Sequence, residues 1–419
     1  MVNLSILTIG DEICIGQIVN TNSAFIASKC TAIGFNVLIH SIIPDKKELM
    51  VAELDRLMSL SDVVVITGGL GPTEDDITKA TLCEYFDDKL ELHKPTFKFL
   101  EKWFSSRGRV MNDLNKSQAY LPSKCKALRN FYGTAPGMLF ERDGKVVISL
   151  PGVPKEMKFI MEDSVLPYLK EMLNNQKTDI ILYKTIHTAG IFESDLAILI
   201  GGKSNFPVEC SFAYLPSYKG VRLRIGVNTQ NFEEGLEKIK KIEDYLMGKI
   251  SKYVVGADSE DLVWSVSNKL RQKNLTVAVA ESCTGGLLGA NFTNYSGSSD
   301  IFKGGIIAYS NAIKVEILGI EKTTIERFGA VSQQTAEEMA KNVRNKFKTD
   351  FGISITGIAG PTGGTPDKPV GTVWIGIADE KQVIAKIFKF GDDREVNRER
   401  SVGAALNMLF QELIKLEKC

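Results

Sequence analysis

The sequence contains few histidines, no paired cysteines and no excess charge of either sign. Only His40, His93 and His187 carry an imidazole, so no residue after position 187 can supply one. The seven cysteines are scattered without a C-x-x-C pair, which argues against a disulfide framework and against a zinc site. The 51 basic and 51 acidic residues give a formal net charge of 0, which argues against a nucleic-acid partner.

Long hydrophobic runs are absent as well. No apolar segment approaches the ~18 residues of a membrane span, and the N-terminus shows no basic and apolar leader. These features predict a soluble protein of the reduced cytoplasm with no membrane partner. The length of 419 residues predicts two or three domains, and 44% hydrophobic with 24% charged residues is typical of a globular protein.

Strand-like and helical stretches alternate at both ends of the chain. Residues 62–67 and 351–356 are continuous apolar runs, typical of strands buried on both faces of a parallel sheet. The alternation predicts two doubly wound α/β domains, at 1–172 and 257–419. Residues 173–256 predict a small α+β domain between them, and two strands near the C-terminus should form a hairpin.

A glycine-rich loop follows the apolar run at 62–67. Gly68, Gly69 and Gly71 would let backbone amides form a concavity for phosphates. Asp75 and Asp76 could hold a divalent cation that bridges those phosphates. The alternative is a glycine turn whose aspartates only favour the positive end of the next helix. We favour phosphate and metal binding, because ligands of open α/β sheets bind at strand ends.

A second acidic pair, Asp11 and Glu12, follows the strand predicted at 4–9. Both acidic loops follow strands of one predicted sheet, so we expect them to meet at the same sheet edge. Lys116, Thr134 and the loop 150–157 complete this half of the chain. Each of these alone is explained by turn chemistry.

The stretch 278–286 is the centre of the last predicted domain. A buried strand runs into Ser282, Cys283, Thr284, Gly285 and Gly286, and helical spacing resumes directly afterwards. The start of a helix offers free N–H groups, and glycines let a substrate approach closely. The alternative is an ordinary turn in which a hydroxyl caps the helix.

A nucleophilic hydroxyl in this domain has no histidine to act as its base. Lysine is a known substitute when burial lowers its pKa. Lys314 and Lys303 are the candidate bases, and Tyr309 could relay a proton. The alternative for each is a surface lysine or a half-buried tyrosine.

Several ordered motifs match one family together. They are Gly10-Asp11-Glu12, Gly69-Leu70-Gly71-Pro72-Thr73-Glu74-Asp75-Asp76, Pro151-Gly152-Val153-Pro154, Glu281-Ser282-Cys283-Thr284-Gly285-Gly286, Tyr309-Ser310-Asn311, Lys314 and Gly357-Ile358-Ala359-Gly360-Pro361. Through them the chain resembles the CinA family, also called competence/damage-inducible protein, over essentially its whole length. Many motifs in the same order are far more specific than any one of them.

The resemblance implies a two-activity enzyme of pyridine nucleotide salvage. The C-terminal domain is similar to nicotinamide-nucleotide amidohydrolase, which converts nicotinamide mononucleotide and water to nicotinate mononucleotide and ammonia without a cofactor. The N-terminal domain resembles the molybdopterin-binding fold and, in this family, an ADP-ribose pyrophosphatase that depends on a divalent cation, Mg²⁺ or a transition metal. The middle segment looks like a KH-like connecting domain, and the family implies a homodimer.

The resemblance also implies residue roles. Ser282 is the expected nucleophile, Lys314 its base and Tyr309 an assisting group. The expected substrate-binding residues are Thr284, Gly285, Gly286, Gly305, Gly360 and Thr362 in the last domain, and Gly68, Gly69, Gly71, Thr73, Lys116 and Gly152 in the first. The expected metal ligands are Asp11, Glu12, Asp75 and Asp76. The sequence departs from the family at Asn20, where an acidic residue is frequent.

Two alternatives stay open at the level of sequence. Cys283 is a rival nucleophile to Ser282. The whole chain could also be a non-catalytic protein that binds a nucleotide or a pterin, and turnover of ADP-ribose with added metal would discriminate between the two classes.

Overall fold

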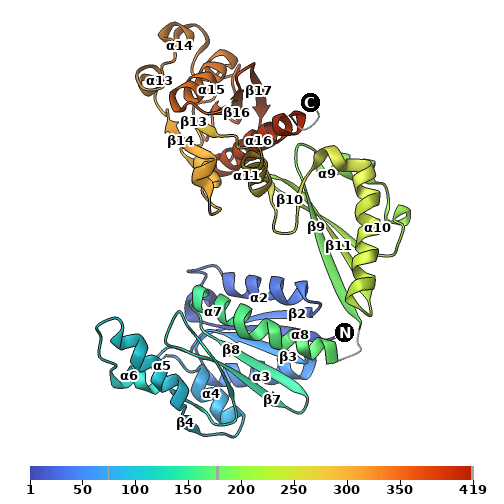
Figure 1. Cartoon of the computed structure of the whole chain (residues 1–419), viewed down its shortest axis with the longest axis vertical. Helices are drawn as coiled ribbons and strands as arrows, with labels where there is room; N and C mark the ends of the chain where they lie inside the picture. The colour runs from blue at the N-terminus through green and yellow to red at the C-terminus, as the bar shows by residue number, and fades with distance from the viewer. Residues whose placement is uncertain (74, 176–178, 417–419) are drawn as a thin grey trace. The chain divides into compact units, whose positions relative to one another are not determined.

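The computed structural model describes residues 1–73, 75–175 and 179–416 (Figure 1). The chain divides into two compact units, Met1–Tyr183 with Gly226–Ile239, and Lys184–Ile225 with Lys240–Cys419.

The N-terminal part is built on a six-stranded sheet of order β2-β1-β3-β8-β7-β6. The strands are β1 (Asn3–Ile9), β2 (Asn36–Ile43), β3 (Val63–Thr67), β6 (Lys126–Leu128), β7 (Gly137–Arg142) and β8 (Lys145–Leu150). The pairs β1–β2, β1–β3 and β3–β8 are parallel, whereas β8–β7 and β7–β6 are antiparallel.

Helices cover both faces of this sheet (Figure 1). One face carries α2 (Thr21–Ala32) and α7 (Pro154–Ile160), which continues through the π-helical turn η1 (Met161–Val165) into α8 (Leu166–Asn175). The other face carries α3 (Lys47–Leu60) and α4 (Thr78–Tyr85). All of β3 is buried between these layers, which explains its unbroken β-branched sequence.

The remaining elements of this part are short. They are α1 (Asp11–Cys14), α5 (Lys94–Ser105), α6 (Asp113–Ser117) and a two-stranded sheet of β4 (Leu90–Leu92) with β5 (Tyr120–Pro122). A two-residue turn with φ of +54° at Asp143 and +76° at Gly144 joins β7 to β8. A connection of that length permits only an antiparallel pair, so this sheet is mixed rather than wholly parallel.

The middle segment forms a four-stranded sheet of order β10-β11-β9-β12. Its elements are β9 (Ile180–Thr188), α9 (Glu193–Ile200), η2 (Lys203–Asn205), β10 (Ser211–Ser217), β11 (Gly220–Thr229), α10 (Phe232–Ile250), η3 (Ser251–Tyr253) and β12 (Val254–Ala257). The division between the two compact units passes through this segment.

The C-terminal part contains a five-stranded sheet of order β14-β13-β15-β16-β17. Its strands are β13 (Val277–Glu281), β14 (Phe302–Ile307), β15 (Phe351–Gly357), β16 (Thr372–Ala378) and β17 (Val383–Lys389). Its helices are α11 (Leu262–Gln272), α12 (Leu287–Phe292), η4 (Ser298–Asp300), α13 (Asn311–Glu316), α14 (Lys322–Phe328), α15 (Gln333–Phe347) and α16 (Arg394–Lys415).

Strand β13 lies inside this sheet, parallel to β14 and to β15. Helices α11, α12 and α16 contribute to the core on one face, and α15 contributes to the core on the other. The predicted hairpin is β16–β17, which pairs antiparallel. The predicted architecture of α/β domains at both ends with a small α+β segment between them is confirmed, and both large sheets continue from parallel strands into antiparallel ones.

Candidate functional site

The candidate nucleophile lies in the turn that links β13 to α12. The amide of Ser282 donates to the carbonyl of Ile355 in β15 at 2.9 Å, which extends the sheet pairing one residue past the end of β13. Gly285 and Gly286 follow with φ of +61° and +98°, a left-handed conformation that residues with a side chain rarely adopt. The two glycines let the chain turn sharply from Ser282 into the helix.

Lys314 reaches Ser282 from α13. Its Nζ lies 3.0 Å from Ser282 Oγ and donates to the carbonyl of Ala308 at 2.6 Å. The lysine is only 1% exposed, and burial lowers its pKa because it penalises the charged ammonium. A lysine with a lowered pKa can take the proton of a hydroxyl that hydrogen-bonds to it. The structure therefore brings the two sequence-predicted residues together in a chemically competent pair.

The rival nucleophile Cys283 is buried beside this pair. Burial raises the pKa of its thiol to about 12, although the positive charges of Lys314 and Arg394 act in the opposite direction. The thiolate is the reactive form of cysteine, so a raised pKa makes the Cys283 thiol less reactive at neutral pH. Ser282 is the better nucleophile on this ground.

The start of α12 is already occupied by a carboxylate of the protein. Glu281, 1% exposed, accepts hydrogen bonds from the amides of Gly286 (3.0 Å), Leu288 (3.0 Å) and Gly289 (2.8 Å). The amide of Gly285 donates to Ser282 O at 3.1 Å. The expectation that these amides receive a substrate group is thus met by neither Gly285 nor Gly286, because both already have acceptors.

Two arginines at the start of α16 hold the surrounding loops. Arg398 donates from Nε and Nη2 to the carbonyl of Thr284 at 3.3 and 3.0 Å. Arg394 donates to the carbonyl of Gly360 at 2.8 Å and to the hydroxyl of Tyr309 at 3.0 Å. The two side chains share one helix face because they are four residues apart. Neither forms a salt bridge with a carboxylate of the described residues.

Other predicted residues of this domain have different surroundings. Tyr309 is 60% exposed, and its hydroxyl meets Arg394 rather than Ser282 or Lys314. Gly305 lies in β14, where a Cβ would come within 2.5 Å of a methyl group of Val279, so strand packing explains the glycine.

Two further candidates are exposed. Thr362 lies in the irregular loop that follows β15. Lys303, the alternative base, is exposed and donates to the carbonyls of Ser299 and Asp300 at 3.0 Å each. The geometry therefore favours Lys314 over Lys303 as the base.

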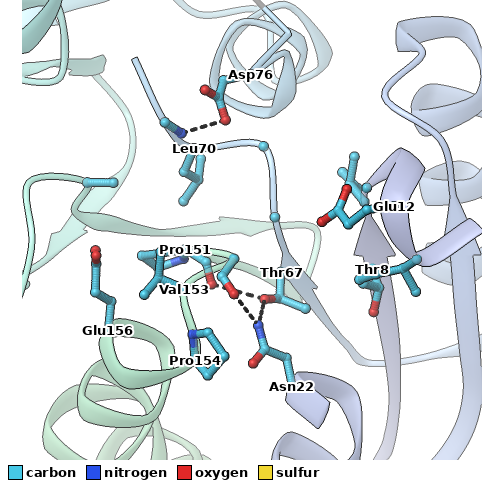
Figure 2. A pocket seen from close by; sticks show the side chains of 18 of the residues that line it. Thr8, Glu12, Asn22, Thr67, Leu70, Asp76, Pro151, Val153, Pro154 and Glu156 are labelled. Carbon is cyan, nitrogen blue, oxygen red and sulfur yellow. Dashed lines mark hydrogen bonds between the residues drawn. The ribbon is translucent and has the colours of Figure 1, made fainter. Parts of the chain in front are cut away.

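A second candidate site is a cavity of about 460 Å³ in the N-terminal part (Figure 2). It lies beyond the carboxyl ends of β1, β3 and β8, where an α/β sheet binds its ligands. The loops that follow these strands line it at 9–10, 12–13, 67–72 and 151–154. The predicted residues Glu12, Asp75 and Asp76 and the predicted glycines Gly68, Gly69, Gly71 and Gly152 are therefore brought to one place.

The glycine loop is close-packed rather than open. A Cβ on Gly68 would lie 2.0 Å from the carbonyl oxygen of Ile9, and its φ is +114°. The amide of Gly68 donates to Leu150 O at 3.1 Å, and that of Gly71 donates to Asp76 Oδ1 at 2.7 Å. These two amides are therefore not free for the phosphate concavity that the sequence predicts, because the loop itself uses them.

Asp76 organises its own loop. Besides the bond from Gly71, its Oδ2 accepts from the amide of Thr73 at 3.0 Å and from the Thr73 hydroxyl. Thr73 contacts Asp76 and is not among the residues that line the cavity. Both oxygens of the predicted metal ligand Asp76 are thus already engaged.

Two acidic residues, Asp45 and Glu156, line the cavity in addition to the predicted ones. Asp45 lines it, and burial, reinforced by the charges of Asp11, Glu12 and Asp76, raises the pKa of its carboxyl. Asp11 itself does not line the cavity, but its amide donates to Asp45 Oδ2 at 3.0 Å. An isolated aspartate just before a helix resembles an ordinary helix start, so Asp45 does not stand out in the sequence.

These carboxylates do not form a ready-made metal site. Within 1–73, 75–175 and 179–416, no group of three or more His, Cys, Asp and Glu is arranged to hold a metal ion. Glu74, the first acidic residue of the predicted loop, lies outside the described residues. The donor set therefore does not fit a metal held by the protein alone.

Lys116 is not part of the cavity. Its Nζ donates to Asp113 at 2.8 Å on the exposed surface of α6, whereas Gln118, two residues further on, lines the cavity. The carbonyl of Gly152 accepts from Nδ2 of Asn22 at 2.8 Å (Figure 2). Gly152 and Asn22 thus connect the loop after β8 to helix α2.

Asn20 has a structural explanation. Its Oδ1 accepts from the amide of Ser23 at 3.1 Å as the cap of α2, while its Nδ2 donates to the hydroxyl of Thr8 at 2.9 Å. A carboxylate could serve the cap but could not donate to Thr8. The amide therefore joins two walls of the cavity.

Models of three families match successive parts of the chain. They describe a molybdopterin binding domain at 5–171, a damage-inducible protein CinA KH domain at 183–256 and a CinA C-terminal domain at 259–413. A CinA-like protein of Cytophaga hutchinsonii is 42% identical over 97% of this chain and 97% of its own length. The chain belongs to the CinA family.

A second relative of similar length supports the same assignment. A protein of Clostridioides difficile, whose name describes it as competence-damage inducible, is 41% identical over 98% of this chain and 99% of its own length. The crystal structure of the competence/damage inducible protein CihA from Agrobacterium tumefaciens is 37% identical, covers 36% of this chain and 92% of its own, and has a TM-score of 0.35.

Both candidate sites lie inside the family matches. Ser282, Lys314 and the two arginines fall in the CinA C-terminal domain, and the cavity falls in the molybdopterin binding domain. None of the helices in the described part of the chain combines the length and the apolarity needed to cross a bilayer.

Proposed function

We propose that the C-terminal domain hydrolyses the carboxamide of nicotinamide mononucleotide to give nicotinate mononucleotide and ammonia. The observation that carries this proposal is the 3.0 Å contact between Lys314 Nζ and Ser282 Oγ, with both side chains buried. The pair supplies a nucleophile and a base in a domain whose sequence has no histidine.

The reaction begins with transfer of the Ser282 proton to Lys314 as Oγ attacks the carboxamide carbon. Lys314 returns this proton to the leaving nitrogen, so that the C–N bond breaks, ammonia departs and an acyl ester of Ser282 remains. Water then attacks the ester with Lys314 again as base, and the proton returns to Ser282 Oγ. Of the amides of Thr284, Gly285 and Gly286, only that of Thr284 has no acceptor among the described residues. We therefore propose that the Thr284 amide donates to the oxyanion.

The two arginines support a phosphorylated substrate. Arg394 and Arg398 bring two guanidinium groups to the rim of the Ser282 turn, and no described carboxylate neutralises them. A guanidinium matches the geometry of a phosphate and can bind it with two hydrogen bonds. We propose that they receive the 5′-phosphate of the mononucleotide, in place of the backbone amides that Glu281 occupies.

Ammonia release from nicotinamide mononucleotide tests this proposal. We expect activity in the wild type and in Cys283→Ala, and loss of activity in Ser282→Ala with an unchanged circular dichroism spectrum. Activity that survives in Ser282→Ala and disappears in Cys283→Ala would reverse the assignment of the nucleophile. A wild type without activity would remove the amidase proposal altogether.

We further propose that the N-terminal domain hydrolyses ADP-ribose to AMP and ribose 5-phosphate. The supporting observation is the 460 Å³ cavity at the strand ends, which the glycine loop and Gly152 border. Glu156 lines it, and burial raises the pKa of this carboxyl above its ordinary value, which makes it a stronger base toward attacking water.

The charge of this cavity supports a requirement for a divalent cation. Carboxylates of Glu12, Asp45, Asp75, Asp76 and Glu156 line it without any lysine or arginine among the described lining residues. A diphosphate would be repelled unless a cation came with it. Mg²⁺ is typically held by one or two carboxylates together with substrate phosphates, so we propose that the cation binds with ADP-ribose rather than before it.

Two measurements distinguish this activity from simple binding. Release of AMP from ADP-ribose with and without a divalent cation reports turnover, and calorimetry with ADP-ribose reports binding. Binding without AMP release would favour the non-catalytic alternative, a domain that holds a nucleotide or a pterin.

A further inference from the structure

A second, smaller cavity lies beside the first in the N-terminal part. Its volume is about 330 Å³, and α5 and the segment 127–136 line it. Phe99, His93 and Thr96 come from α5 and its start, and Arg129, Asn130 and Thr134 come from the segment. None of these residues has a role in the reaction described above.

The two cavities are neighbours across one short loop. Thr134 lines both of them. Asn130 holds the loop in place, because its Oδ1 accepts from the amides of Tyr132 and Gly133 at 3.0 Å each. Its Nδ2 donates at 2.6 Å to Glu156, whose side chain borders the first cavity (Figure 2). Thr134 and the hydrogen bond between Asn130 and Glu156 therefore form a boundary that the two cavities share.

The two cavities differ in charge. The residues that line the second include Arg129 and His93 and no carboxylate, whereas carboxylates line the first. Arg129 lies with its guanidinium carbon 5.3 Å from the ring centre of Phe99 and 4.2 Å from that of Phe131. Among the described residues no carboxylate pairs with it. The aromatic rings thus hold a planar cation that has no anionic partner in the described part of the chain.

The remaining groups of the second cavity suit a flat heterocycle. The ring of Phe99 and the guanidinium of Arg129 are both planar surfaces on which a nucleobase can stack. His93 bonds through Nδ1 to the hydroxyl of Thr96 at 2.7 Å, and its Nε2 has no partner within the described ranges. Nε2 is therefore available for one hydrogen bond to the edge of a base.

We propose that the second cavity binds the nucleobase of the nucleotide whose diphosphate occupies the first. Phe99 and Arg129 stack on the base, and His93 contacts its edge. The inference rests on the proposed role of the first cavity as a nucleotide site. It adds the prediction that the base is recognised in the second cavity and the diphosphate is hydrolysed in the first.

Calorimetry on the full chain with AMP, adenosine and ribose 5-phosphate tests the proposal. We expect Phe99→Leu and Arg129→Lys to weaken AMP and adenosine by roughly 5- to 150-fold, the loss typical of one stacked base. Neither change should alter ribose 5-phosphate, which has no base. Phe97→Leu is the matched control, because Phe97 lies in the same helix and the same small aromatic core but does not line the cavity.

Each outcome decides the proposal. Unchanged AMP affinity in Phe99→Leu and Arg129→Lys, or an equal loss of ribose 5-phosphate, would overturn it, and the second result would mean that Arg129 binds phosphate. An equal effect of Phe97→Leu would show that the fold and not the cavity was altered, and would also overturn it. If the wild type does not hydrolyse ADP-ribose but AMP binding depends on Phe99 and Arg129, the hydrolase proposal fails and this one stands.

Discussion

Replacement of Lys314 by methionine should abolish deamidation while it leaves the domain folded. Methionine keeps an unbranched chain of similar length but has no group that can take the proton of Ser282. A positioned general base contributes about 10²- to 10⁴-fold to a rate, so we expect the kcat of Lys314→Met to fall by at least about 10²-fold. The measurement is ammonia release from nicotinamide mononucleotide.

The same substitution should change stability in a way that depends on pH. Burial lowers the pKa of Lys314 in the folded protein, whereas the unfolded chain has the ordinary lysine pKa of about 10.4. Below the lowered pKa, both states are protonated, and folding carries the full cost of burying the ammonium. As pH rises toward about 10.4, the folded lysine is neutral and this cost disappears.

Lys314→Met should therefore gain stability over the wild type at low pH and lose that advantage as pH rises. Methionine also leaves the carbonyl of Ala308 without its donor, which costs about 1–3 kcal/mol at every pH. The free energy of unfolding of Lys314→Met minus that of the wild type should thus decrease as pH rises. This difference becomes negative where the cost of the unpaired Ala308 carbonyl exceeds the remaining cost of burying the ammonium. Urea unfolding at several pH values measures it.

Lys303→Met is the matched control, because Lys303 is exposed and donates to the backbone carbonyls of Ser299 and Asp300 rather than to a group of the site. It should keep both the activity and the stability of the wild type. Full activity in Lys314→Met, or an equal loss in Lys303→Met, would refute the Ser282–Lys314 mechanism. A wild-type kcat/KM that does not fall as pH is lowered would refute the neutral lysine on which it depends.

Three further predictions concern the surroundings of the two sites. Arg394→Ala and Arg398→Ala should raise the KM for nicotinamide mononucleotide but not for nicotinamide riboside, and an equal rise for both substrates would mean that the arginines only hold the loops. Glu281→Gln keeps one oxygen that can accept from the amides at the start of α12 but removes the charge of the side chain. It should therefore lower the kcat of deamidation more than it changes the KM. An unchanged kcat would mean that Glu281 does not position the Ser282 turn. Asp76→Ala should remove ADP-ribose hydrolysis and leave deamidation intact. Asp76→Asn can still accept from the amide of Gly71, so it should retain more ADP-ribose hydrolysis than Asp76→Ala. An equal loss of hydrolysis in the two variants would favour a role for the negative charge of Asp76.

The predictable part of the fold follows from patterns that are local in sequence. The buried strands β3 and β13 are rich in apolar residues because both of their faces are covered. Such a run can be recognised as a buried strand from the sequence alone. The segment 90–150 has no comparable pattern, because its strands are short and its sequence is irregular. Asp143-Gly144, where the structure places the turn between β7 and β8, is a pair typical of two-residue hairpin turns.

The residues of the candidate site also differ in how far the sequence alone reveals them. The absence of histidine from this domain makes lysine the candidate base for Ser282 and leaves Lys303 and Lys314 open, whereas the choice of Lys314 follows from the family resemblance. Arg394 and Arg398 were missed, since an arginine pair at the start of a helix looks like a solvated face until the Ser282 turn is placed beside it. The role of Glu281 is not visible in the sequence, because its partners, the amides of Gly286, Leu288 and Gly289, reach it only through the left-handed turn at Gly285 and Gly286.

The two proposed sites differ in how they balance the negative charge of a substrate phosphate. Both proposed substrates carry phosphate. The Ser282 site faces it with Arg394 and Arg398, fixed cations that need nothing added. The cavity of the N-terminal domain is lined by Glu12, Asp45 and Asp75 with no fixed cation among its described lining residues, so we expect the phosphates of the proposed substrate to enter together with a mobile counterion. A chelator that removes divalent cations should therefore stop ADP-ribose hydrolysis and leave ammonia release unchanged in the same sample of the full chain. Loss of both activities would mean that the amidase site also depends on a cation, which its two arginines give no reason to expect.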